Sequence, residues 1–262
     1  MDKFSKHFAD ILKLWGKYGG SYLTGMRNTL VLALVGTVIG CIIGFVCGVL
    51  NTIPYTDRDP LPKRVLLKLV RIIVRVYVEV FRGTPMVLQA VFIYYGLPYF
   101  TDNAVKFTNI WLAAMIVVSI NTGAYMAEIV RGGIISIDKG QFEGAMSIGI
   151  THSQTMLKVI IPQVMRNILP SVSNEFVINI KDTSVLNVIG VTELYYFAGI
   201  IKRQSFETFQ TYLVICVIYF ILTFTITRLL RWVERKLDGG DSYVIFGSQS
   251  DSAAEIHISR EA

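Results

Sequence analysis

The chain has 262 residues, of which 53% are hydrophobic and only 17% are charged. Soluble domains carry about a quarter charged residues, so this composition excludes an ordinary soluble domain. The formal net charge is +6, but the basic residues lie between long apolar runs instead of forming one stripe, which argues against nucleic-acid binding. We therefore predict an all-α integral membrane protein.

The sequence offers few residues that could act in catalysis or bind a metal. The three cysteines, Cys41, Cys47 and Cys216, lie inside apolar runs, and the three histidines are far apart in the sequence. An odd number of such cysteines predicts neither a disulfide framework nor a zinc site. The sequence also lacks a G-x-x-x-x-G-K-[ST] phosphate loop. We predict no catalytic residues, no metal site and no cofactor on this chain.

Five stretches are predicted to cross a membrane, because a spanning helix needs ~20 apolar residues. In chain order they cover about residues 29–50, 83–102, 110–131, 163–185 and 209–231. Together they form a transmembrane domain over residues 29–236. The apolar part of the second stretch, Met86 to Phe100, is too short to cross alone and must borrow a turn from Glu79 to Pro85. Residues 1–28 are expected to form an extracytoplasmic segment, and residues 237–262 a disordered cytoplasmic tail.

Charged residues recur at intervals of three or four positions before the second stretch, on an otherwise apolar helix. They are Arg64, Lys68, Arg71, Arg75, Glu79 and Arg82. This pattern is typical of a helix at a membrane surface or boundary, and equally of the solvated face of an ordinary helix. The segments that flank the predicted spans on the same side of the membrane as this charged helix hold more Lys and Arg than the segments on the opposite side, although the N-terminus is also basic. We therefore predict the N-terminus outside and the C-terminus in the cytoplasm.

Gly36, Gly40, Gly44 and Gly48 fall four residues apart in the first stretch, and therefore on one helix face. Small residues at this spacing let a second helix approach closely, although glycine is common in membrane helices generally. We predict that this face packs against another helix.

The loop between the third and fourth stretches carries helix signals. Asp138 can cap a helix that Gly149 ends. Thr151 or Ser153 can cap a second helix that runs to the end of the loop. Two short helices joined at a glycine form a compact protrusion suited to a groove in a partner protein. We call residues 137–162 the knob.

The knob resembles the EAA loop of importer permeases of the ATP-binding-cassette (ABC) class. That loop reads E-A-A, three residues, G, nine residues, I-x-L-P; its spacing is matched here by Glu143, Gly144, Ala145, Gly149 and Pro162. Gly144 replaces the first alanine of the pattern, and Val159 and Ile161 replace its isoleucine and leucine. Residues 81–85, 124–133, 137–141 and 181–184 also resemble the polar amino acid branch of the class.

The resemblance implies a type I importer permease with five spans in the bacterial inner membrane, moving a polar amino acid inward by ATP-driven alternating access. It implies a dimer of ATPase subunits that hold ATP and Mg, a second permease subunit (identical or different), and an extracytoplasmic solute-binding protein. Membrane lipid is the remaining partner, and no nucleic acid is expected. It also implies that the five matching knob residues, Glu143 and Gly149 foremost, couple the permease to the ATPase.

Polar residues in or near the third and fourth stretches are candidates for the translocation path. They are Asn121, Tyr125, Asn179, Lys181 and Asp182. A zwitterionic amino acid needs one anionic and one cationic contact, with amides to orient it. Lys181 and Asp182 are adjacent, so they point in different directions on a helix. Hydrogen bonds between spans explain Asn121 and Asn179 equally well, and that alternative stays open.

Glu128 and Arg131 are three residues apart at the end of the third stretch, so they can pair on one helix face. Such a pair is either a gating element or a structural anchor, and the sequence favours neither. Pro162 and Pro170 are expected to break or bend the start of the fourth stretch and to form a hinge.

Three other functional interpretations compete with that of an importer permease. A secondary, ion-coupled transporter or a channel would act without an ATPase, but it needs charges deep in the spans, and the middle of the first, third and fifth stretches has none. An intramembrane enzyme ranks last, because no nucleophile–base motif is present. A regulatory receptor built on the permease scaffold stays open, because fold does not fix function.

Overall fold

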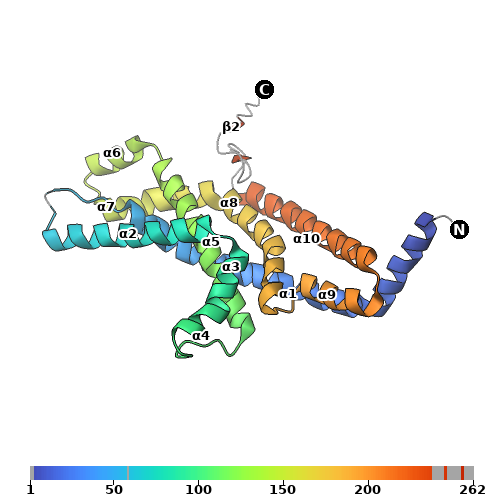
Figure 1. Ribbon diagram of the computed structural model, residues 1–262. Coiled ribbons are helices and arrows are strands. Elements are labelled where there is room, and N and C mark those ends of the chain that lie inside the picture. Colours follow the sequence, from blue (N-terminus) through green and yellow to red (C-terminus); the bar gives the residue numbers. More distant parts are fainter. Residues whose placement is uncertain (1–2, 58, 238–244, 247–254, 257–262) are drawn as a thin grey trace, which may run out of the picture.

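The computed structural model describes residues 3–57, 59–237, 245–246 and 255–256, with side chains described for residues 9–57 and 59–236. Nearly all of this part is helical (Figure 1). In chain order the elements are α1 (Lys3–Thr52), α2 (Leu61–Gly83), α3 (Met86–Val91), the π-helix η1 (Phe92–Gly96), α4 (Leu97–Phe100), α5 (Ile110–Ile135), α6 (Lys139–Ser147), α7 (His152–Thr155), the π-helix η2 (Met156–Ile160), α8 (Ile161–Asp182), the 3₁₀-helix η3 (Thr183–Ile189), α9 (Leu194–Ser205), α10 (Thr208–Leu237), and the strands β1 (Ile245–Phe246) and β2 (Glu255–Ile256).

Three helical stretches in the described residues are each long and apolar enough to cross a membrane. They are Ala9–Thr52, Ile110–Ile135 and Thr208–Lys236. Two further runs, His152–Ile189 and Leu194–Ser205, pass the same test together as one span with a bend of 56°. The apolar helix Met86–Phe100 is shorter than these, in agreement with the short second stretch of the sequence.

The short second span begins at a break in the chain. Helix α2 ends at Gly83, Thr84 has an extended backbone (φ −123°, ψ 144°), and Pro85 precedes the first turn of α3. Proline disfavours a helical conformation in the residue before it, so α2 and α3 cannot merge into one straight helix. The predicted stretch 83–102 is therefore a short half-span that follows α2.

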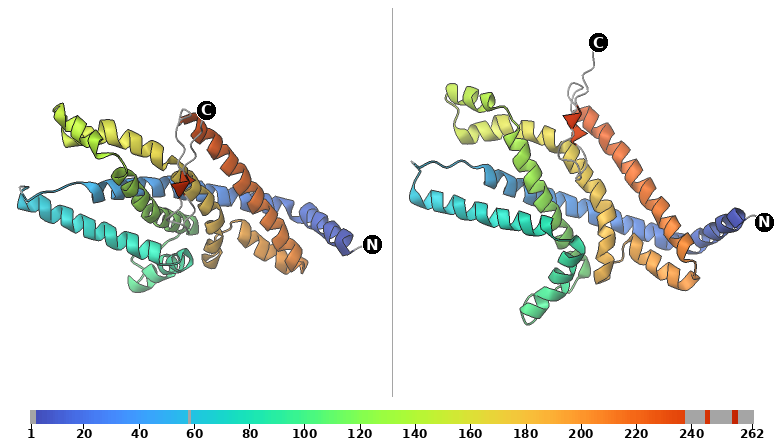
Figure 2. Two further views of the ribbon diagram at one scale, coloured as in Figure 1. Left: turned by 90° about the horizontal axis from the view of Figure 1, so that it is seen from above. Right: turned by 45° about the horizontal axis from the view of Figure 1, so that its top comes forward.

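The longest helix, α1, crosses the whole molecule (Figures 1 and 2). The knob and the α1–α2 turn lie at one end, and the α9–α10 turn lies at the other end beside the N-terminal part of α1. Helix α1 starts at Lys3, so the first span continues far into the predicted segment 1–28. The tail predicted to be disordered lies outside the described residues, except for β1 and β2, which pair antiparallel.

The glycine face of α1 packs on α5, as the spacing predicts. A Cβ atom on Gly40 would lie 2.6 Å from Thr122, and one on Gly48 would lie 2.7 Å from Val130. A Cβ atom on Gly36 would likewise collide with Val118, and one on Gly44 with Met126. The glycines of α1 and the residues of α5 that they contact therefore both recur every four positions. The absent side chains allow the two backbones to approach closely, and dispersion contacts over the whole row then hold the helices together.

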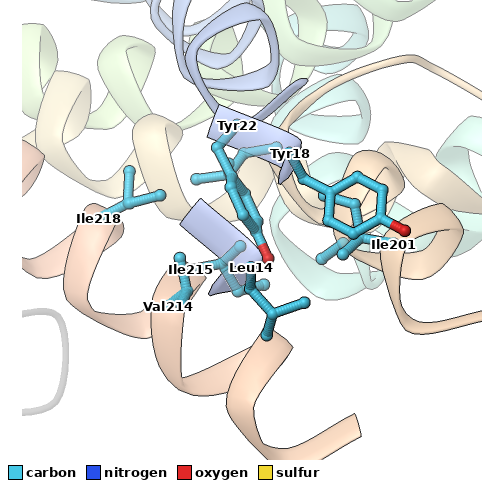
Figure 3. Packing of buried hydrophobic residues seen from close by; sticks show 9 residues of the cluster. Leu14, Tyr18, Tyr22, Ile201, Val214, Ile215 and Ile218 are labelled. Carbon is cyan, nitrogen blue, oxygen red and sulfur yellow. The ribbon is translucent and has the colours of Figure 1, made fainter. Parts of the chain in front are cut away.

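The N-terminal part of α1 packs on α9 and α10. Leu14, Tyr18 and Tyr22 are buried in one cluster with Ile201 of α9 and Ile215 of α10 (Figure 3). This apolar contact fixes the bent second half of the fourth span against the first span.

Glu193 fastens the same region by hydrogen bonds. Its fully buried carboxylate accepts the backbone N–H groups of Tyr195 (2.8 Å) and Tyr196 (2.6 Å), and the hydroxyl of Tyr219 on α10 (3.0 Å). The backbone N–H of Leu194 donates to the Thr29 hydroxyl of α1 (3.2 Å). One carboxylate therefore caps α9 and holds it to α10.

We expect Glu193→Ala to destabilise the protein by about 3 kcal/mol or more, because it leaves three buried donors without an acceptor at ~1–3 kcal/mol each. Thermal unfolding of the purified protein in mild detergent measures the loss. The matched control is Glu207→Ala, which removes a half-buried carboxylate in the α9–α10 turn, at the opposite end of α9 from Glu193. Equal melting temperatures for the two variants would contradict the capping role.

Candidate functional site

The first helix of the knob has the predicted caps. The Asp138 carboxylate accepts the backbone N–H of Gly140 (2.6 Å) at the start of α6. At its end, Gly149 has φ +80°, its N–H donates to Met146 (3.0 Å), and the next N–H donates to the Ala145 carbonyl (3.1 Å). This is the Schellman arrangement, in which a left-handed residue closes the last turn, and glycine adopts that conformation without strain.

The second helix of the knob is the start of the fourth span. Thr151, and not Ser153, caps α7 in a reciprocal capping box with Gln154. Helices α7, η2 and α8 then follow one another without a gap from His152 to Asp182.

The two prolines of this run do not interrupt it. Pro162 lies in the first turn of α8, directly after the wider π-helical turn η2, and Pro170 lies inside the continuous α8. The helix is therefore not broken at either proline, and the bend and the hinge that the sequence predicts there stay predictions. A π-turn before Pro162 accommodates the missing N–H donor within the helix.

One side of the knob is buried and the other is exposed. Phe142 of α6 stacks on His152 of α7 (6.4 Å between ring centroids) and joins an apolar cluster that contains Ile134 of α5 and Ile160 of η2. Ala145 is buried as well. These contacts join α6 to α5 and to the start of the fourth span.

The outer side of the knob presents Glu143 and Gly144, both exposed. Three large apolar side chains of the knob are exposed as well: Met146 is 64% exposed, Ile148 74% and Leu157 69%. An exposed apolar group of this size beside a carboxylate is typical of a surface that a partner covers.

At the break between α2 and α3, the candidate Asn121 binds protein groups. Its amide donates to Gln89 Oε1 (3.0 Å) and to the Phe81 carbonyl (3.3 Å). The Gln89 amide donates in turn to the carbonyls of Phe81 and Thr84 (both 2.9 Å). Carbonyl groups freed by a broken helix inside a membrane need such donors. Gln89 is a contributor that sequence reasoning missed, because its role depends on the helix break at Thr84 and on Asn121, which is 32 residues away.

The candidate Asn179 joins three helices. Its amide donates to the hydroxyls of Thr37 on α1 (2.8 Å) and Thr122 on α5 (2.9 Å), and its side chain is 2% exposed. These contacts are the interhelical hydrogen bonds of the alternative interpretation, and the path role of the two asparagines stays a prediction.

Charged residues gather where α2, α5 and α8 approach one another. The Arg82 guanidinium lies 5.3 Å from the ring centroid of Tyr125, and it interacts electrostatically with both Glu128 and Glu175. Glu128 also forms the pair that its spacing allows with Arg131, at 2.8 Å. Three helices that are far apart in the sequence thus contribute these charges: Arg82 lies on α2, Glu128 on α5 and Glu175 on α8.

Glu175 stands out in this group because it is only 3% exposed. It lies seven residues before Asp182 on the same face of α8, and the two carboxylates interact electrostatically. Neither Arg82 nor Glu175 was among the predicted site residues. The sequence could have indicated both, because Arg82 and Glu175 are ionisable residues next to or within predicted spans.

Lys181 points to a different place from Asp182, as their adjacency predicts. It lines a pocket of about 320 Å³ together with residues of η3, α9 and α10. The other lining residues are Ser184, Tyr195, Tyr212, Ile215, Cys216 and Tyr219. The five predicted path residues are therefore distributed over separate places: two bind other helices, Tyr125 faces Arg82, and Lys181 and Asp182 diverge.

Residues 63–239 match the family model described as the inner membrane component of binding-protein-dependent transport systems. The chain belongs to this family. Its glutamine-transport relatives include the Glutamine transport system permease protein GlnP of Escherichia coli (strain K12), 35% identical over 82% of this chain and 92% of the relative. The Putative glutamine transport system permease protein GlnP of Rickettsia bellii (strain RML369-C) is 33% identical over 84% and 96%.

Solved structures agree with this assignment. A crystal structure of an amino acid ABC transporter with histidines has 34% identity and a TM-score of 0.73, and the match covers 84% of this chain and 95% of that one. The inward-facing MetNI methionine ABC transporter has 19% identity and a TM-score of 0.63 over 82% and 95%, and shows the same fold. The predicted all-α permease fold is confirmed, and this chain is a multi-pass inner-membrane permease subunit of an ABC importer. The family favours this function over an ion-coupled transporter and over an enzyme.

Proposed function

We propose that this permease moves a polar amino acid, glutamine first among the candidates, into the cell. The observation that carries the substrate class is the electrostatic attraction between the buried Glu175 carboxylate and exposed Arg82, whose guanidinium lies over the Tyr125 ring. A zwitterion offers a carboxylate to the guanidinium and an ammonium group to the carboxylate. Relatives named for glutamine transport, with more than four fifths of this chain matched, support the choice of an amide amino acid.

The proposed partners follow from the family and the knob. An extracytoplasmic solute-binding protein delivers the amino acid, and two ATPase subunits hold ATP and Mg on the side of the knob. Exposed Glu143 and its apolar neighbours Met146 and Ile148 enter a cleft of the ATPase. A second permease subunit, identical or different, completes the path. Membrane lipid surrounds the apolar outer faces.

The proposed orientation places the knob and the α1–α2 turn in the cytoplasm, with the N-terminus outside. Basic residues gather at this turn: Arg64 lies 2.6 Å from the exposed Asp57 carboxylate, and Arg71 donates to the Ile53 carbonyl (2.5 Å) while its guanidinium lies over the Tyr55 ring. Such residues remain on the cytoplasmic side during membrane insertion.

Coupling then proceeds by rigid-body movement. Closure of the ATPase subunits shifts α6, and the buried contacts of Phe142 and Ala145 pass the shift to α5 and α8. Because α7 continues into α8, the same shift moves Glu175 relative to Arg82 and alternately opens the path to the two sides.

We expect Glu175→Gln to reduce glutamine uptake at least tenfold in vesicles that contain the permease, the ATPase and the binding protein. The amide keeps the shape of the side chain but loses the charge that attracts the substrate ammonium group. Binding-protein-independent ATP hydrolysis should be retained. The control is Glu207→Gln near the α9–α10 turn. Wild-type uptake by Glu175→Gln would overturn the proposed path.

A further inference from the structure

The α9–α10 turn contains a bulky residue in a strained conformation. Phe206 has φ +60° and ψ 9°, which is the left-handed region, and its N–H donates to the Lys202 carbonyl to close α9. Glycine is the usual residue at this position, because a Cβ atom crowds the backbone there. The other described non-glycine residues with positive φ are Asp102 and Asn103, whose short polar side chains tolerate this region.

The rest of the chain does not compensate this strain. The Phe206 side chain is 88% exposed, so it gains almost no packing within the subunit. Phe209, which begins the apolar part of α10, is 69% exposed. A strained, exposed aromatic pair indicates that the favourable contacts come from outside the chain.

The position of the α9–α10 turn indicates what surrounds Phe206 and Phe209. Helix Thr208–Lys236 is long and apolar enough to span a membrane, and Phe206 precedes its first residue by two positions. Exposed Arg203 supplies a cation beside it. At the far end of the short half-span, Tyr99 (79% exposed) and Phe100 (76% exposed) are equally uncovered. Aromatic rings with neighbouring cations at the ends of spans are typical of the headgroup level of a bilayer, where cations meet lipid phosphates.

We infer that Phe206 and Phe209 form an interfacial anchor that inserts into the lipid headgroup–acyl boundary on the side opposite the knob. The anchor offsets the left-handed strain at Phe206 and holds the α9–α10 corner at a fixed depth. Because α9 and α10 carry Tyr195 and Tyr212, it also fixes the wall of the pocket that Lys181 lines. This inference does not depend on the identity of the transported amino acid.

The test uses tryptophan fluorescence. Phe206→Trp is made in a chain whose three native tryptophans, Trp15, Trp111 and Trp232, are replaced by phenylalanine. The protein is placed in vesicles of phosphatidylethanolamine and phosphatidylglycerol with phosphatidylcholine brominated near the head or near the end of its acyl chains. We expect stronger quenching by the head-brominated lipid, and weak quenching by aqueous iodide.

The matched control is Phe220→Trp, an exposed position further along α10, where chain-end bromine should quench more strongly. Phe209→Trp repeats the test at the same corner if Phe206→Trp does not fold. Quenching by iodide without quenching by either lipid would overturn the inference. It would do so even if added solute-binding protein then protected the tryptophan from iodide.

Phe206→Gly relieves the strain and should therefore raise the melting temperature of the protein in detergent. An unchanged or lower melting temperature would contradict the strain argument.

Discussion

Glu143→Lys abolishes uptake while the protein remains folded in the membrane; this is the largest functional effect that we expect. The side chain is exposed at the tip of the knob, so the fold does not depend on it. A reversed charge at a desolvated contact costs several kcal/mol in binding. Uptake into vesicles, together with affinity purification of the tagged permease and mass spectrometry of the proteins that accompany it, measures both consequences.

A P-loop ATPase should accompany the unmodified chain and be lost with Glu143→Lys. The matched control is Asp57→Lys, a charge reversal at the α1–α2 turn of the same end, where the side chain is 95% exposed and its pair with Arg64 contributes little. If no ATPase purifies with the unmodified chain under conditions that preserve membrane complexes, the coupling role of the knob fails. Normal uptake by Glu143→Lys would remove Glu143 from that role.

The largest structural effect is expected for Gly44→Leu. A side chain at this position collides with Met126 and with the backbone of Ala127 on α5, so no rotamer change relieves the contact. The helices must separate, which forfeits dispersion contacts along the whole glycine face at a cost of about 3 kcal/mol or more. We expect little monodisperse protein in size-exclusion chromatography after mild solubilisation.

Gly20→Leu is the matched control in the same helix, because a Cβ atom there meets no neighbour within 4 Å. It should purify like the unmodified protein. Equal yields of monodisperse protein for the two variants would show that the glycine face does not determine the packing of α1 on α5.

Local signals in the sequence predicted the elements of the knob correctly. The Asp138 cap, the left-handed Gly149 and the Thr151 cap depend on backbone groups within a few residues, so sequence alone specifies them. The glycine spacing on α1 also predicted a packing face, because helical periodicity is a local property. Of the break or bend predicted at Pro162 and Pro170, the structure shows no break: the helix continues through both residues, and a π-helical turn directly precedes Pro162.

The sequence by itself therefore determined the membrane class, the apolar stretches, the helix caps and the motif of the family. Only the tertiary structure decided which polar groups meet: Asn179 with Thr37 and Thr122, Gln89 with Asn121, and the Arg82 guanidinium with the Tyr125 ring. Their partners lie on other helices, often more than thirty residues away. Helix crossing and rotation, which no local pattern encodes, bring such groups together, and inside a membrane such hydrogen bonds hold the helices to one another.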